Sequence, residues 1–81
     1  MDKQEKFDKL VERMELPENR VRRTSTILSK VDTTIAQNIA DMREYLTKLN
    51  DTTRSDTYII GLQFDDKYDK VVRILDEQGW A

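Results

Sequence analysis

The amino-acid sequence predicts an all-α fold in which a short N-terminal helix precedes a long central helix and a C-terminal helix that pair as a hairpin. Apolar residues recur at helical spacing along most of the chain, which is the main signal for amphipathic helices. The chain holds one proline and two glycines, and Pro17 and Gly79 stand where helices are expected to begin or end. With 81 residues, it is expected to form a single helical domain over 1–81.

The N-terminal helix is predicted over about 3–15. Phe7, Leu10, Val11 and Met14 recur at the i, i+3, i+4, i+7 spacing of one helical face. Pro17 disfavours the interior of a helix but suits the first turn of the next one. The second helix is therefore expected to begin at about residue 18.

The second helix is predicted to be long, over about 18–50, because one apolar stripe keeps its phase along it. The stripe repeats every seven residues, the coiled-coil pattern, and consists of Val21, Leu28, Ile35, Met42 and Leu49. A continuous helix of this length would measure roughly 50 Å, far more than the first helix could cover. We therefore expect the stripe to bind a second copy or a helical partner subunit, so that the protein is oligomeric.

Two segments leave alternatives open. Thr34, three residues before Gln37, forms a capping-box pattern, so the run Asp32–Thr34 favours a kink or a new helix start. The unbroken phase of the stripe favours a continuous helix instead.

Residues 58–64 alternate in polarity as a strand would. Ile60, Phe64, Tyr68, Val71 and Leu75 also share one helical face. A lone strand would have no pairing partner within the chain, so a third helix over about 56–78 is the preferred prediction, followed by Gly79 as its cap.

The residue inventory argues against catalysis. The chain has no histidine and no cysteine, and its two isolated glycines cannot form a phosphate-binding loop. We therefore predict a non-enzyme with no cofactor, no metal and no small-molecule substrate. Asp65, Asp66 and Asp69 form the densest carboxylate cluster, interpreted as a solvated face or a docking surface for a basic partner.

The one basic cluster suggests an alternative function. Asn19, Arg20, Arg22 and Arg23 stand at the start of the second helix and are chemically suited to phosphates and base edges. The segment FDKLVERMELPENRVRRTSTIL resembles the bacterial helix-turn-helix pattern over about 22 residues, which implies a DNA-binding regulator. It departs from that pattern at Glu15, where glycine is usual, at Val11 and at Thr24.

The favoured prediction is an intracellular, regulatory protein-binding module such as an assembly factor, adaptor or small inhibitor. No stretch approaches the roughly 18 apolar residues of a membrane-spanning helix, and no signal peptide is apparent. Trp80 is added to the stripe as a candidate partner-binding residue, since aromatic side chains often anchor interfaces. Packing of Trp80 on the chain's own helices is the equal alternative.

Overall fold

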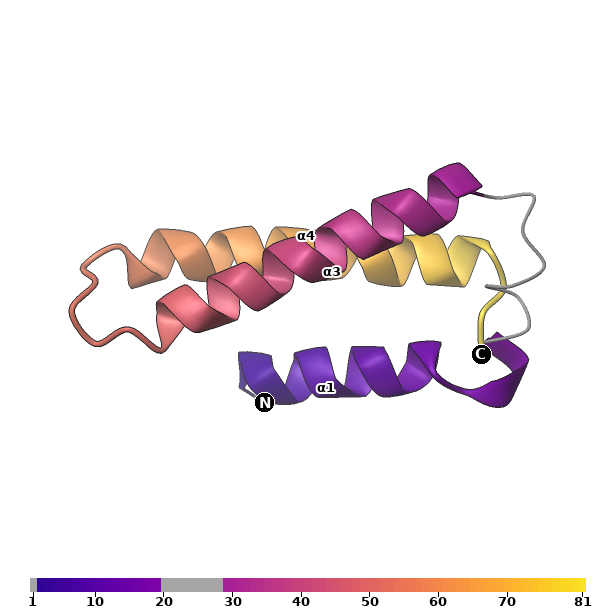
Figure 1. Ribbon diagram of the computed structural model, residues 1–81, viewed down its shortest axis with the longest axis horizontal. Coiled ribbons are helices and arrows are strands. Elements are labelled where there is room, and N and C mark those ends of the chain that lie inside the picture. Colours follow the sequence, from indigo (N-terminus) through magenta and orange to yellow (C-terminus); the bar gives the residue numbers. More distant parts are fainter. Residues whose placement is uncertain (1, 20–28) are drawn as a thin grey trace.

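The computed structural model describes residues 2–19 and 29–81, and these ranges consist of helices and short connecting or terminal segments, with no strand among them (Figure 1). The helices with full bounds are α1 (Lys3–Met14), α3 (Ser29–Leu49) and α4 (Thr57–Glu77). Helices α3 and α4 run antiparallel as a long hairpin, and α1 lies alongside it (Figure 1). The predicted all-α class and the helical hairpin are confirmed.

Helix α1 begins and ends close to the predicted bounds. The Asp2 side chain caps it by accepting a hydrogen bond of 2.9 Å from the backbone N–H of Glu5. A turn at residues 15–16 follows the helix, and residues 17–19 are again helical. Pro17 therefore starts a helical turn, as its lack of an N–H predicts.

Helix α3 passes through Asp32–Thr34 without a break, so the capping-box pattern there does not start a new helix. The continuous phase of the apolar stripe is the stronger signal, because burying one face along a helix outweighs a local propensity for a cap. The predicted continuation over 20–28, with Val21 and Leu28, lies outside the described residues.

Helix α4 settles the ambiguity at 58–64 in favour of a helix. Ile60 and Phe64 lie one turn apart on the core face of this helix, and both are buried. Gly61 is buried where α1 approaches closely. A Cβ atom at this position would lie 3.2 Å from Cε of Lys3. The glycine therefore leaves room for the Lys3 side chain.

The core lies between all three helices and corrects one expectation. It contains Phe7, Leu10, Ile35, Ile39, Met42, Leu46, Phe64, Val71, Leu75 and Trp80. The stripe residues Ile35 and Met42 are thus buried inside the chain rather than left open for a partner, and Leu49 is half-buried. The expectation compared the stripe with the short first helix. Helix α4 is as long as the described part of α3, with 21 residues in each, and it covers the stripe residues there.

Candidate protein-binding surface

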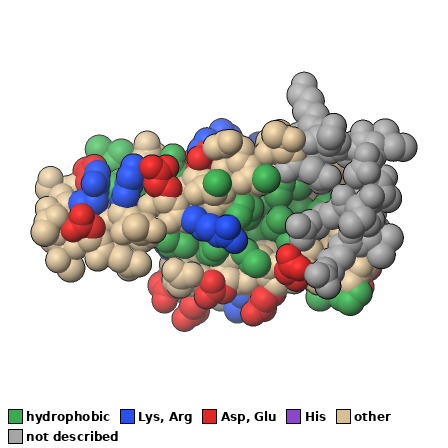
Figure 2. Space-filling view, viewed as in Figure 1, with side chains coloured by type: hydrophobic (Ala, Val, Ile, Leu, Met, Phe, Trp, Pro, Cys, Tyr) green, Lys and Arg blue, Asp and Glu red, His purple; other side chains and the backbone are tan. Residues whose placement is uncertain are grey.

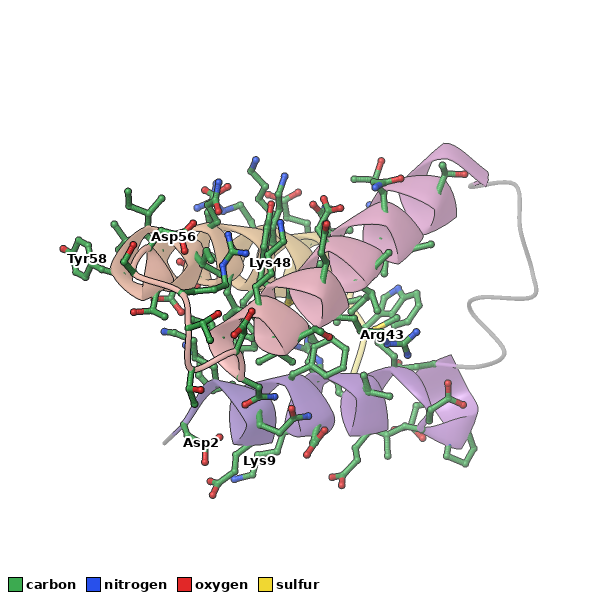
Figure 3. The ribbon with its side chains drawn as sticks, turned by 60° about the vertical axis from the view of Figure 1, so that its left-hand side comes forward. Asp2, Lys9, Arg43, Lys48, Asp56 and Tyr58 are labelled. Atoms are coloured by element: carbon green, nitrogen blue, oxygen red, sulfur yellow. The ribbon has the colours of Figure 1, made fainter. Side chains whose placement is uncertain are left out.

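The N-terminal part of α4 carries apolar side chains on its outer face as well as on its core face. Tyr58, Ile59 and Leu62 are 77%, 60% and 52% exposed. Residues three and four apart on a helix are neighbours, so these three form one contiguous exposed patch. Figure 3 shows Tyr58 projecting away from the helices at the hairpin end. Single exposed apolar residues are ordinary, but a contiguous group of this size marks a candidate binding surface.

A shallow groove of about 380 Å³ adjoins this exposed patch. Its lining comes from both helices of the hairpin: Tyr45, Ile59, Leu62, Gln63, Asp66 and Lys67. The Lys67 ammonium lies 3.7 Å from the Asp41 carboxylate and so links α4 to α3. The lining of the groove therefore combines apolar side chains with charges of both signs.

The groove lies on the side of the hairpin opposite α1. Lys3 contacts Asp65 and Lys6 contacts Tyr68, so this side of α4 faces α1. Each residue turns a helix by 100°, so Gln63 and Lys67, each two positions from Asp65, point about 160° away from it. We call the side with Ile59, Leu62 and Gln63 the open flank. Tyr58, seven positions before Asp65, points within about 20° of Asp65 and so borders this flank next to the side that faces α1.

The space-filling view shows the face of the molecule that is turned towards the viewer in Figure 1. Apolar side chains are visible between the helices, and charged residues of both signs surround them (Figure 2). Asp65 pairs with Lys3 at 3.0 Å and with Lys6 at 3.9 Å, and Asp76 pairs with Arg13 at 2.7 Å. Part of the predicted acidic face is thus paired within the chain.

Charged residues of the α3–α4 connector border the exposed patch. Arg54 donates two hydrogen bonds, of 3.0 and 2.9 Å, to the Asp56 carboxylate. This pairing lowers the pKa of Asp56 and raises the pKa of Arg54. Asp51 accepts hydrogen bonds from the hydroxyl and the N–H of Thr53, which lower its pKa too. The connector therefore keeps charges of both signs beside the patch.

Among the residues predicted for nucleic-acid contact, Asn19 is fully buried. Its Nδ2 donates to the Arg13 carbonyl at 2.7 Å, and its Oδ1 accepts from the Ala81 N–H at 3.0 Å. The Asn19 amide therefore serves the fold. Arg20, Arg22 and Arg23 lie outside the described residues, so the DNA-binding alternative stays a prediction from the sequence.

Trp80 is buried in the core, where the sequence left anchor and core roles equally open. Helix α4 ends in a Schellman motif. The Trp80 N–H donates to the Leu75 carbonyl at 2.9 Å, the Gly79 N–H donates to the Asp76 carbonyl at 3.1 Å, and Gly79 has a φ of 74°. This motif often brings the residue after the glycine onto the helix's last turn, and here Trp80 and Leu75 share the core. Gly79 followed by an apolar residue was the sequence signal for this outcome.

Sequence reasoning missed the exposed patch. Its signal was present in the ambiguity of 58–64, because Tyr58 and Leu62 fit the strand pattern but fall outside the helical face of Ile60 and Phe64. Once the segment is a helix, these extra apolar residues must lie on its outer side.

The described residues also lack two kinds of feature. They contain no group of three or more acidic, histidine or cysteine residues placed to hold a metal ion. Within the same ranges, no helix has the length and apolar character needed to cross a membrane. The chain matches no protein-family model, and the searches of curated proteins and of solved structures found no match either.

Proposed function

We propose that this protein is a non-enzymatic protein-interaction module that binds another protein chain on the open flank of α4. The observation that carries the proposal is the exposed patch of Tyr58, Ile59 and Leu62 beside the groove. Removing apolar surface from water stabilises a complex by roughly 25 cal/mol per Å². An apolar helix laid in such a groove is a common mode of protein recognition.

The side chains of the surface have distinct expected roles. Ile59 and Leu62 both line the groove and remain more than half exposed, so they are the expected anchors. Tyr58 adds a large aromatic surface at the edge, a residue type enriched at binding hot spots. Asp66, which lines the groove and pairs with Lys70 at 3.2 Å, would contribute orientation more than affinity.

A photo-crosslinking residue placed at Leu62 in the full chain tests this proposal in cells. We expect discrete crosslinked products that contain a protein partner, because position 62 would lie in the interface. The matched control places the same photo-crosslinking residue at position 16. Leu16 is exposed but does not line the groove. Equal products from both positions, or none from position 62, would overturn the proposal.

A further inference from the structure

We infer that α1 is a releasable cover over a second protein-binding site, and that an amphipathic helix of a partner protein binds there in place of α1. The site is the face that α3 and α4 present to α1, so it differs from the open flank of the proposed function. The basis of the inference is the way α1 is held. Two buried side chains and a few partly exposed charged ones attach it to the hairpin.

The apolar contact of α1 is small compared with the contact between α3 and α4. Phe7 and Leu10 are its two buried residues, whereas seven of the ten core residues among the described ranges lie on α3 and α4. Helix α1 has 12 residues, and a helix of that length is marginal in water without a neighbour to pack on. Elements with few buried apolar contacts open before the rest of a domain unfolds. We therefore expect α1 to leave while α3 and α4 stay paired.

Ion pairs at both ends of α1 define how a helix lies on this face. Near its start, the ammonium groups of Lys3 and Lys6 lie 3.0 and 3.9 Å from the Asp65 carboxylate. Near its end, Arg13 lies 2.7 Å from Asp76. The two carboxylates are 11 positions apart on α4 and the outer two basic residues 10 apart on α1, or about 16 and 15 Å. The matched spacing fits a helix parallel to α4, as α1 is (Figure 1).

The contacts of α1 also specify the chemistry of the partner helix. The Arg43 guanidinium of α3 lies 5.7 Å from the centre of the Phe7 ring, so the face favours an aromatic side chain at that place. An aliphatic side chain three positions later takes the place of Leu10. Basic residues before and after these two meet Asp65 and Asp76. Because the ion pairs are partly exposed, they orient the helix, and the two apolar side chains supply most of the affinity.

The C-terminal segment reports the release of α1. Arg13 donates hydrogen bonds of 2.7 and 3.0 Å to the carbonyls of Ala81 and Trp80, and Asn19 accepts one of 3.0 Å from the Ala81 N–H. Trp80, the only tryptophan, is buried. Release of α1 breaks these hydrogen bonds, so the emission of Trp80 should shift to longer wavelength.

Hydrogen exchange of the full wild-type chain, followed by NMR, tests whether α1 opens alone. The amides of Leu10 and Val11 should have protection factors about a hundredfold or more below those of Phe64 and Val71, because α1 opens without global unfolding. Equal protection at all four amides, with the same dependence on denaturant, overturns the inference, since α1 would then open only when the whole chain unfolds.

A labelled peptide of residues 2–19 tests whether the uncovered face binds a helix. Phe7→Ala in the full chain should raise the open fraction of α1 by about a hundredfold or more, the effect of losing a buried aromatic side chain. Fluorescence anisotropy should show peptide binding to this variant that is about tenfold or more tighter than to the wild type, whose own α1 competes. Saturating peptide should also return the Trp80 emission to shorter wavelength. The matched control peptide carries Phe7→Ala and should bind neither chain.

A second chain variant leaves the apolar core intact. Lys3→Glu combined with Lys6→Glu places like charges beside Asp65, so this chain should bind the wild-type peptide severalfold more tightly than the wild-type chain does. Equal binding to all three chains, or binding to none of them, overturns the inference. The proposed function fails separately, because crosslinks from position 62 report on the open flank.

Discussion

The two flanks of α4 both carry apolar groups, yet the described residues of the chain cover only one of them. On the α1 flank, Gly61 is buried and Phe64 has no exposed surface. On the open flank, Ile59 and Leu62 are more than half exposed although they belong to the same turns of the helix. The difference shows that burial along α4 depends on which neighbour is present, not on the apolar character of the residue.

Basic side chains of α1 cover the flank of α4 that faces α1. Lys3 passes close to Gly61, its ammonium pairs with Asp65, and it lies 5.8 Å from the centre of the Phe64 ring. Lys6 lies 4.5 Å from the centre of the Tyr68 ring. Long basic side chains can cover apolar surface with their stems while the charged end remains near water. On the open flank, the described residues leave Ile59 and Leu62 more than half exposed.

The largest expected change in the free energy of unfolding comes from a substitution on the α1 flank. Phe64→Ala should lower the free energy of unfolding by ~3–5 kcal/mol, because a fully buried aromatic side chain leaves a cavity. This loss is a large part of a small domain's stability. Urea unfolding followed by circular dichroism measures it.

The matched comparison is Leu62→Ala on the open flank. Its effect should stay within about 0.5 kcal/mol at low protein concentration, since the side chain is already half exposed. Equal losses for the two variants at low concentration would show that the flanks do not differ as described.

The second effect concerns the end of α1, where the chain closes over Trp80. Asn19→Ala should cost about 1–3 kcal/mol, because the Ala81 N–H loses its hydrogen-bond acceptor in a part-buried site. The emission of Trp80, the only tryptophan, should shift to longer wavelength as the C-terminal segment loosens. Asn50→Ala, at an exposed position, is the control and should leave both stability and emission unchanged. Unchanged emission in Asn19→Ala would separate Asn19 from the burial of Trp80.

Helical periodicity allowed most of the fold to be predicted from the sequence. The phase of Ile35 and Met42 predicted a helix through Asp32–Thr34, and the shared face of Ile60 and Phe64 predicted α4. Both succeed because a buried face constrains a helix over several turns. Periodicity could not show which neighbour covers a face, and the stripe was therefore assigned to a partner although α4 covers Ile35 and Met42.

The candidate site was less predictable, because it depends on pairings between distant residues. Lys3 and Asp65 are 62 positions apart, so their contact follows only from how α1 lies on α4. The burial of Asn19 likewise depends on the backbone of Ala81. The exposed patch could be identified only after the flank facing α1 was known.

The smallest expected effect tests how α1 is held against α4. Asp65→Asn removes the carboxylate that pairs with Lys3 and Lys6, whose side chains and Asp65 are each about one third exposed. Such pairs contribute about 0.2–1 kcal/mol, and both ammonium groups keep their aromatic rings as neighbours. The variant should therefore lose less than about 1 kcal/mol in urea unfolding at low salt. In 1 M salt, where charges are screened within about 3 Å, it should match the wild type. Asp69→Asn, one turn further along α4, is the control for removing a carboxylate from the same helix. A loss that persists in 1 M salt would mean that Asp65 holds α1 by packing or hydrogen-bond geometry rather than by charge. The contact between α1 and α4 would then depend on close packing, as the core does.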